Sequence, residues 1–235
     1  MTVALGSNFG DYAFLASDSR ATFYDLDGTA RSFEDDQKKI YKTKLGILTG
    51  AGSIPLLEAV KDQLENNEKF NQVTDTNSIQ QVIKEALLNY SKSYWLTQAR
   101  DVKITGWIFT YNAIIENKPK LRLTMVHPAD AKEIALIQEN KPAVIYPCEA
   151  SPEQVNIIHQ CLEKNIKPLH DFSSINDSIQ YHTAIIANII RQIQPTFPII
   201  SPYFQIGVHT LGGVGISEII QDNKPFNFEL QLNSK

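Results

Sequence analysis

The sequence predicts an α+β protein arranged as a four-layer αββα sandwich, in which two antiparallel sheets face each other and helices cover both. Three observations lead to this fold class. Strand-like and helix-like segments come in separate runs, in the order strands, two helices, strands, two helices, strands. Each predicted helix carries one apolar stripe that must be buried against another element. Runs separated in this way are typical of α+β layers and not of alternating βαβ units.

The first fifty residues or so are expected to form strands. Apolar runs are interrupted here by turn residues, at 8–11 (Asn-Phe-Gly-Asp) and at 25–28 (Asp-Leu-Asp-Gly). The strands predicted from these runs are Val3–Ser7, Tyr12–Asp18, Lys39–Lys42 and Leu45–Thr49.

The pattern then changes to a helical period for two segments. Ser53 is a plausible N-cap with Pro55 in the first turn. A polar stretch follows, and Ser78 with Gln81 predicts a capping box for a second helix. The apolar stripes of these two helices are Leu56, Leu57, Val60 and Leu64, and Ile79, Val82, Ile83, Ala86, Leu87 and Tyr90.

Strands and a second helical pair complete the order. Ser151, Pro152 and Gln154 combine an N-cap, a proline at the first helical position and a capping-box glutamine. Another helix is expected from about Ser174 to Gln194. The strands expected in this part are Val102–Tyr111, Leu121–His127 (after a hairpin loop at Asn112–Pro119), Glu133–Gln138, Ala143–Tyr146, Phe204–Thr210, Val214–Ile220 and Phe226–Leu232.

The composition is that of one globular domain, covering residues 1–235. The chain has 43% hydrophobic and 20% charged residues, and no Pro/Gly/Ser-rich stretch is long enough to act as a linker. A formal net charge of -4 argues against a nucleic-acid partner. There is no secretory signal and no stretch of membrane-spanning length, so we expect a cytoplasmic protein without membrane contact.

Metal and cofactor chemistry is not expected. The two cysteines, Cys148 and Cys161, are not part of paired CxxC motifs, and a reduced, structural state is the simpler interpretation. The five histidines show no metal-ligand spacing, and His182 lies on an apolar helix face, as core histidines do. The glycines at 212, 213 and 215 lack the lysine and the helix of a phosphate loop.

The most informative residues lie near the N-terminus. Removal of Met1 would leave Thr2 with both a hydroxyl group and a free α-amine. A hydroxyl needs an adjacent base to become a nucleophile, and a terminal amine with a reference pKa near ~8 can serve as that base. A cationic Lys39 nearby would lower the pKa of the amine, and Asp18 could hold the lysine by a charge-assisted hydrogen bond.

Three segments then resemble the proteasome β-subunit family. Residues 16–22 (Ala-Ser-Asp-Ser-Arg-Ala-Thr) resemble its Ala-Ala-Asp-Ser-Arg-Ala-Thr stretch, and Asp18 follows Thr2 by sixteen residues, as in the family. Residues 38–41 (Lys-Lys-Ile-Tyr) resemble its lysine pair ahead of an apolar strand. Residues 48–52 (Leu-Thr-Gly-Ala-Gly) resemble the segment that enters its first helix. Clear motif identity is confined to these first fifty residues, although the order of elements is similar over most of the chain.

The resemblance implies an Ntn-hydrolase fold and a set of roles. Thr2 would be the nucleophile, Asp18 and Lys39 its charge-setting partners, and the Gly50 N–H an oxyanion donor of the kind that typically contributes a few kcal/mol to lowering the barrier. It also implies a peptide or amide substrate, no cofactor, and assembly into homo-oligomers, as rings or smaller.

Each of these residues also has a purely structural alternative. Asp18 and Arg20 could form a simple surface ion pair, and the cluster of Lys38, Lys39 and Lys42 could form a solvated strand edge. Gly50 could serve only the turn into the first helix. The agreement of all of them with the family's order and spacing favours the functional interpretation.

The sequence also departs from the family pattern in two places. Active members carry a Ser-Gly-Ser stretch before the third helix, where residues 146–151 read Tyr-Pro-Cys-Glu-Ala-Ser. They also carry an Asp followed three residues later by Ser after the fourth helix, where residues 196–202 contain Ser201 but no Asp. If Met1 were retained, the α-amine would lie one residue away from the Thr2 hydroxyl and could not act as its base.

Three functions therefore stay open at the level of sequence. The first is a proteasome-like threonine peptidase or amide hydrolase. The second is a catalytically inactive Ntn-fold protein used for assembly or binding, and the third is a small-molecule amidase on the same fold. The sequence does not choose the substrate or the oligomer size.

Overall fold

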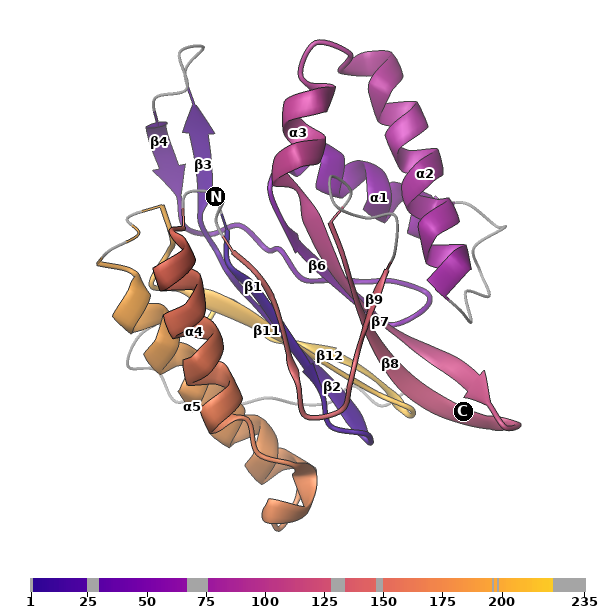
Figure 1. Ribbon diagram of the computed structural model, residues 1–235, viewed down its shortest axis with the longest axis vertical. Coiled ribbons are helices and arrows are strands. Elements are labelled where there is room, and N and C mark those ends of the chain that lie inside the picture. The colour runs from indigo at the N-terminus through magenta and orange to yellow at the C-terminus, as the bar shows by residue number, and fades with distance from the viewer. Residues whose placement is uncertain are drawn as a thin grey trace.

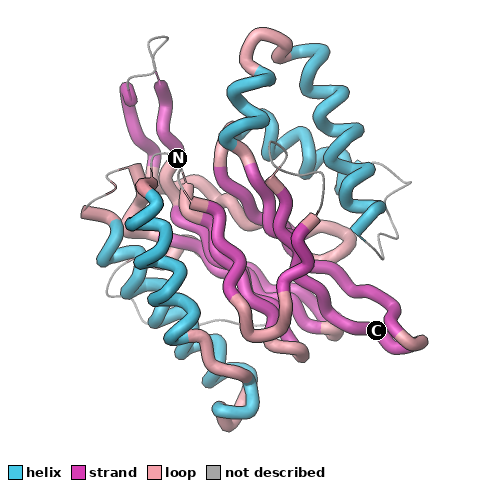
Figure 2. The backbone as a smooth tube through the Cα atoms, viewed as in Figure 1, coloured by secondary structure: helices cyan, strands magenta, loops and turns pink. Residues whose placement is uncertain are grey.

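The computed structural model describes residues 2–24, 30–66, 76–127, 134–146, 150–195, 197 and 199–221. Within these ranges the chain is a mixed α/β protein with two five-stranded antiparallel sheets, one separate two-stranded hairpin and two groups of helices (Figure 1). The strands lie between the two groups of helices (Figure 2). The predicted order of strands and helices is confirmed for the described residues, except that a third, short helix follows the first helical pair.

The first sheet has the strand order β10-β1-β2-β11-β12. Its strands are β1 (Ala4–Asn8), β2 (Tyr12–Asp18), β10 (Pro142–Ile145), β11 (Phe204–Thr210) and β12 (Gly213–Ile216). All neighbours pair antiparallel, and the register places Phe204 opposite Asp18 and Gln205 opposite Ser17. Strand β11, from the C-terminal part of the chain, therefore runs directly beside the strand that ends at Asp18.

The second sheet has the strand order β5-β6-β7-β8-β9. Its strands are β5 (Tyr41–Lys42), β6 (Ile47–Ala51), β7 (Gly106–Ile115), β8 (Lys118–Val126) and β9 (Ala135–Ile137). The central strand β7 pairs with β6 on one side and with β8 on the other. The glycine at position 50 faces Trp107 across this ladder.

A separate hairpin extends away from both sheets. It consists of β3 (Ala21–Tyr24) and β4 (Ala30–Glu34), which pair antiparallel. In Figure 1 this hairpin projects from the molecule next to the N-terminal end of the chain. The sequence signals only the turn between these strands, so the hairpin itself was not predicted.

Three hydrophobic clusters connect these elements. One joins β1, β2 and β11 to α4 (Pro152–Asn165) and α5 (Ile175–Ile193). Another joins β6 and β7 to α1 (Ile54–Asn66) and α2 (Thr76–Ser93). A third contains Leu15 of the first sheet together with Ile47, Ile108 and Leu123 of the second. The two sheets therefore share buried apolar contacts, and each also packs against its own helices.

Helix capping follows the sequence where the cap residues are short and polar. Ser151 accepts a hydrogen bond from the Gln154 N–H, and the Gln154 side chain accepts one from the Ser151 N–H, which completes the predicted capping box. Ser174 caps α5 by accepting from the Asp177 N–H. These two helix starts are confirmed.

Four local predictions need correction. Helix α2 begins at Thr76, so Ser78 lies inside it and does not cap it. Residues 102–104 belong to a short helix, α3 (Gln98–Ile104), in which Asp101 accepts a hydrogen bond from Tyr90 Oη at 2.5 Å and its carbonyl oxygen accepts one from Thr105 Oγ1 at 2.6 Å. The loop expected at Asn112–Pro119 shrinks to Glu116 and Asn117, whose φ values of 52° and 60° suit a tight hairpin turn.

The fourth correction concerns β12, which ends at Ile216, while Ile220 forms an isolated bridge to Phe204. The strand predicted at Phe226–Leu232 and the residue Cys148 lie outside the described residues. A 3₁₀ turn, η2 (Leu169–Asp171), connects α4 to α5. Within the described ranges, none of the helices combines the length and the hydrophobicity needed to cross a bilayer.

Candidate active site

Thr2 and Lys39 meet at the start of β1. The Lys39 Nζ donates a hydrogen bond to Thr2 Oγ1, and both residues are buried, with relative exposures of 7% and 5%. Thr2 lies two residues before β1 begins at Ala4, and Lys39 lies in the segment that leads into β5. The fold therefore brings into contact two residues that are 37 positions apart in the sequence.

Asp18 anchors this contact from the end of β2. Its carboxylate is fully buried and accepts hydrogen bonds from three backbone N–H groups. These come from Val3 at 2.8 Å, Arg20 at 3.0 Å and Ser201 at 3.3 Å. Lys39 Nζ lies 3.5 Å from the same carboxylate. Asp18 thus fixes the residue after Thr2 and also supplies the nearest negative charge to Lys39.

The Lys39 ammonium group has three acceptors around it. Besides Thr2 Oγ1 and Asp18 Oδ2, the carbonyl oxygen of Arg20 accepts from Nζ. An ammonium group has three N–H donors, so this environment satisfies its charged form. Burial nevertheless lowers the pKa of Lys39 below its ordinary 10.5, because desolvation outweighs the opposing attraction of Asp18. A buried lysine with a lowered pKa is neutral more often than a solvated one.

The backbone of Lys39 is held by side chains from both sheets. The Oε1 of Gln205, on β11, accepts from the N–H groups of Lys39 and Ile40 at 3.2 and 3.0 Å. From β6, Thr49 Oγ1 donates to the Lys39 carbonyl oxygen at 3.0 Å. Gln205 and Thr49 are both buried. Lys39 is therefore fixed at its peptide groups as well as at its side chain.

Arg20 makes an ion pair next to this cluster, although not with Asp18. Its Nε and one terminal nitrogen donate to the two carboxylate oxygens of Asp35, each at 2.6 Å. The Arg20 guanidinium beside Asp35 holds the pKa of that carboxyl below its usual range, and Asp35 raises the pKa of Arg20. The Arg20 group also lies 4.8 Å from the centre of the Phe33 ring. The interpretation of Asp18 and Arg20 as a simple surface ion pair is therefore wrong, because Asp18 is buried and Arg20 pairs with Asp35.

Ser19, at the β2–β3 corner, forms hydrogen bonds to the segment that contains Asp35 and Gln37. Its hydroxyl donates to the Asp35 carbonyl oxygen at 2.7 Å, and its carbonyl oxygen accepts from the Gln37 N–H at 3.1 Å. The segment between β4 and Lys39 is thus bonded to the β2–β3 corner at successive points. These hydrogen bonds determine the position at which the segment places Lys39.

Gly50 lies on β6, one residue after Thr49. A Cβ atom at this position would sit 2.5 Å from Leu57 Cδ2 and 2.6 Å from the Gly106 carbonyl oxygen, so no side chain fits. Among the described residues, Gly50 is linked to Lys39 through the hydroxyl of its neighbour Thr49. Its assignment as an oxyanion donor remains a prediction.

Two buried polar residues near the cluster were not recognised as important from the sequence. In the sequence, Ser201 is only the serine of a stretch that lacks the family's Asp, yet in the fold its N–H binds Asp18 and its Oγ lies 3.2 Å from Ser19 Oγ. Gln205 gave no signal, since a single glutamine in a strand pattern is ordinarily a solvent-facing residue. Only the folded structure, in which Gln205 is 2% exposed, identifies it as a buried residue.

Lys38 shows the opposite behaviour to its neighbour. Its side chain is 57% exposed and forms an ion pair with Glu218 at 2.9 Å. The solvated-edge interpretation of the lysine cluster therefore holds for Lys38 and fails for the buried Lys39. This contrast makes Lys38 a matched control for Lys39.

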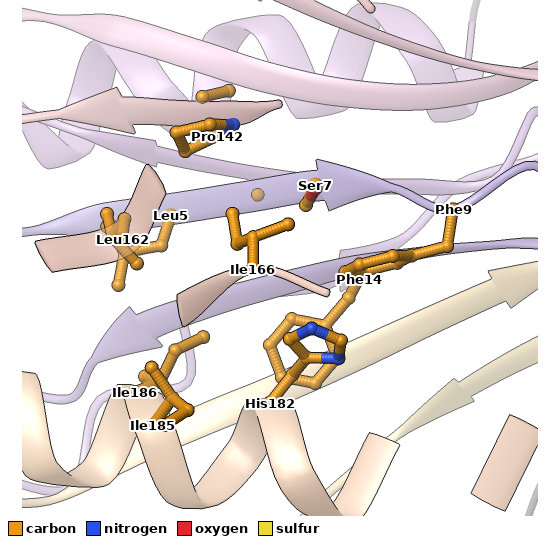
Figure 3. A pocket seen from close by; sticks show the side chains of 12 residues that line it. Leu5, Ser7, Phe9, Phe14, Pro142, Leu162, Ile166, His182, Ile185 and Ile186 are labelled. Atoms are coloured by element: carbon orange, nitrogen blue, oxygen red, sulfur yellow. The ribbon is translucent and has the colours of Figure 1, made fainter. Parts of the chain in front are cut away.

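Two cavities lie elsewhere in the fold. The first is an apolar pocket between the first sheet and the helices α4 and α5, lined by Leu5, Phe14, Ile186 and His182 among others (Figure 3). The second is an open, more polar pocket where the β1–β2 turn meets the start of α5. It lies beyond the end of β1 that is remote from Thr2. Thr2, Asp18 and Lys39 line neither of them.

His182 is a satisfied core histidine. Its Nδ1 donates to the Ser178 carbonyl oxygen at 2.8 Å, and its Nε2 accepts from the Lys167 N–H at 3.3 Å. Burial lowers its pKa to about 4. Both ring nitrogens are therefore in use with the neutral ring. Within the described part of the chain, no group of three or more His, Cys, Asp or Glu side chains could hold a metal ion.

Comparison with solved structures finds a match over almost the whole chain. Among solved structures, the chain is similar to the Anbu (Gly-1) mutant from Hyphomicrobium sp. strain MC1, with a TM-score of 0.62 and 14% sequence identity. The match covers 95% of this chain and 89% of that chain. Anbu is a bacterial proteasome-related protein. At this identity the likeness shows the fold alone, which is proteasome-like. No protein-family model matches the chain, and no curated protein does.

Proposed function

We propose that this chain is an N-terminal-threonine amide hydrolase of the Ntn type, with Thr2 as its nucleophile after removal of Met1. The proposal takes residues 1–235 as one domain and the fold as the four-layer αββα sandwich. The three hydrophobic clusters and the likeness to Anbu support that architecture. By the same likeness we propose a homo-oligomer, as a ring or a smaller assembly, that acts on peptide or amide substrates.

The observation that carries the proposal is the contact between Lys39 Nζ and Thr2 Oγ1. A threonine hydroxyl needs a base within hydrogen-bond reach before it can attack a carbonyl. Lys39 is within that reach, and burial lowers its pKa, which increases the fraction of neutral amine that can take a proton. Asp18 and the Arg20 carbonyl oxygen hold the same nitrogen in place.

The reaction proceeds through an ester. Thr2 Oγ1 forms a bond to the substrate carbonyl carbon, and the hydroxyl proton passes to the base. The C–N bond of the amide then breaks as the leaving amine receives that proton. Water next attacks the ester and releases the acid and the threonine hydroxyl. The Gly50 N–H is proposed to bind the oxyanion that forms in both steps.

Two groups can serve as the base, and the state of residue 1 separates them. After removal of Met1, the free α-amine belongs to Thr2 itself, and the cationic form of Lys39 lowers the pKa of that amine. Lys39 in its neutral form can instead accept the hydroxyl proton directly, since it touches Oγ1. The second route does not need the free amine.

A second candidate function is a catalytically inactive assembly or binding protein with the same fold. It is favoured by the departures from the family pattern, since residues 146–151 lack the Ser-Gly-Ser stretch and residues 196–202 lack the Asp. Ser201 binds Asp18 through its backbone N–H and so restores only part of the missing arrangement.

Intact mass spectrometry of the natively expressed protein tests both candidates. The protein is treated with an epoxyketone or a β-lactone, reagents that capture nucleophilic threonines. Loss of Met1 together with a single adduct, absent in Thr2→Ala, would support the hydrolase. Full retention of Met1 without any adduct would overturn it and leave the inactive protein. A β-lactone adduct on a chain that keeps Met1 would assign the base to Lys39.

A further inference from the structure

The segment that carries Lys39 has no strand partner of its own. Residues 36–40 lie outside the helices and strands, between β4 and β5. Lys39 and Ile40 are nevertheless buried, with exposures of 7% and 3%. Buried backbone N–H groups must be hydrogen-bonded, and the N–H groups of Lys39 and Ile40 have no strand ladder to supply their acceptors.

Gln205 supplies that partner for two successive N–H groups. Its Oε1 accepts from Lys39 at 3.2 Å and from Ile40 at 3.0 Å. Its Nε2 donates to the Ser217 carbonyl oxygen at 2.9 Å. The chemistry of these neighbours orients the amide, because two N–H donors require the oxygen and one carbonyl requires the nitrogen. Gln205 is therefore held in one orientation with its oxygen toward Lys39.

Thr49 holds the same peptide from the opposite sheet. Its Oγ1 donates to the Lys39 carbonyl oxygen at 3.0 Å, and the side chain is 1% exposed. Gln205 comes from β11 in the first sheet, and Thr49 comes from β6 in the second. Two buried side chains from different sheets thus bind the Lys39 backbone: Gln205 accepts from its N–H, and Thr49 donates to its C=O.

The position of Gln205 in the sheet connects its hydrogen bonds to the Lys39 segment with Asp18. Gln205 pairs with Ser17 across the β11–β2 ladder, and its neighbour Phe204 pairs with Asp18. Strands β2 and β11 therefore position both the Asp18 carboxylate and the backbone of Lys39, the lysine with which Asp18 pairs. Neither Gln205 nor Thr49 has a hydrogen bond to Thr2 among the described contacts.

We propose that Gln205 and Thr49 are positioning residues for the threonine hydrolase, forming a clamp on the Lys39 peptide that sets the reach of its Nζ to Thr2. The proposal rests on the proposed function for its catalytic meaning, while the clamp itself is a statement about Lys39. Without Gln205, two buried N–H groups lose their only acceptor in the described contacts, and the segment must shift to find water. Lys39 then leaves its buried position.

The main test replaces Gln205 by Met, which is similar in size and has no acceptor oxygen at that place. We expect adduct formation at Thr2 by a β-lactone to slow at least tenfold. We also expect the pH midpoint of that reaction to move up toward the ordinary lysine value of 10.5, because Lys39 becomes solvated. Thr183→Val is the matched control, since it removes another buried hydrogen bond, from Thr183 Oγ1 to Ile179, away from the site.

A second readout does not depend on activity. The side-chain titration of Lys39 is followed by NMR in lysine-labelled protein and assigned with Lys39→Arg. Gln205→Met should move this titration upward, and Thr183→Val should leave it unchanged. A Lys39 titration and an adduct rate that both stay the same in folded Gln205→Met would overturn the clamp.

Two further variants keep the proposal testable if Gln205→Met does not fold. Thr49→Val removes the hydroxyl bond to Lys39, and Thr49→Ser keeps it. The clamp predicts a shifted Lys39 titration in the valine variant and its recovery in the serine variant. Equal titrations in the two would contradict it. If the wild-type protein forms no adduct, the hydrolase proposal fails, and the titrations still decide the clamp.

Discussion

Lys39 Nζ and Thr2 Oγ1 form a buried hydrogen bond between two segments that belong to neither the same strand nor the same hairpin. Thr2 lies just before β1, and Lys39 lies in the segment after the β3–β4 hairpin. Asp18 receives the Val3 N–H at 2.8 Å and lies 3.5 Å from Lys39 Nζ, so one carboxylate ties both segments together. This relationship determines what each of the following variants should do.

Removal of the Lys39 amine should strongly slow the reaction of Thr2. We expect Lys39→Ala to lower the rate of adduct formation by roughly 100-fold or more, as loss of a general base does. Lys38→Ala should leave the rate unchanged, because Lys38 is exposed and pairs with Glu218. Both rates are obtained by intact mass spectrometry at several reaction times. Equal rates in the two variants would remove Lys39 from the mechanism.

The reactivity of Thr2 should increase with pH if Lys39 is the base. The neutral amine is the active form, and burial lowers its pKa, so the midpoint of the rate profile should lie below 10.5. Asp18 opposes this shift, and Asp18→Asn should therefore move the midpoint to lower pH. The profile is measured with the β-lactone, using the reagent's own hydrolysis as the reference. A midpoint that Asp18→Asn leaves in place would contradict this assignment.

The bidentate ion pair between Arg20 and Asp35 should stabilise the β2–β3 corner and the segment that leads to Lys39. Arg20→Lys retains the charge but cannot make both 2.6 Å bonds to the Asp35 carboxylate. We expect it to lower the free energy of unfolding by about 1 kcal/mol, since the pair is only partly shielded from solvent. Urea denaturation measures this change. An unchanged midpoint would mean that the Ser19 contacts alone hold the corner.

Acid should destabilise the fold through two buried histidines. Burial lowers the pKa of His209 and of His182 from 6.5 to about 4. Between these values the unfolded chain binds more protons than the folded one, so the free energy of unfolding falls as pH drops from 6.5 to 4. Each histidine contributes at most about 3 kcal/mol to this loss.

The contribution of His209 can be isolated by substitution. His209 Nδ1 lies 2.9 Å from Thr110 Oγ1, and a glutamine can keep a hydrogen bond to that hydroxyl. His209→Gln should therefore show a weaker dependence of the urea midpoint on pH between 6.5 and 4, whatever its stability at neutral pH. A dependence as steep as that of the wild type would place the acid sensitivity elsewhere.

An added methyl group at Gly50 should damage the site and the fold together. Its Cβ would overlap Leu57 Cδ2 at 2.5 Å and the Gly106 carbonyl oxygen at 2.6 Å. The carbonyl belongs to β7 and cannot rotate away, so Gly50→Ala should cost about 1–3 kcal/mol of stability, as overpacking typically does. Thermal unfolding checks the stability, and the β-lactone checks the site. A fully stable and reactive variant would show that β6 can shift without affecting Thr2.

The sequence by itself determined most of the order of the elements and which residues are the candidates for a reactive site. Amphipathic period and short polar caps act within a few residues, and so Ser151 and Ser174 mark their helices correctly. The spacing from Thr2 to Asp18 and the lysine pair at residues 38–39 were likewise visible in the chain, through their resemblance to a family motif.

Only the tertiary structure decided which lysine is buried and what holds it. Lys38 and Lys39 are identical side chains in adjacent positions, yet one is solvated and the other touches Thr2. Gln205 and Thr49 reach Lys39 from strands of different sheets. Contacts of this kind depend on how distant strands pack, because desolvation and hydrogen-bond geometry act through space. No local pattern in the sequence records them.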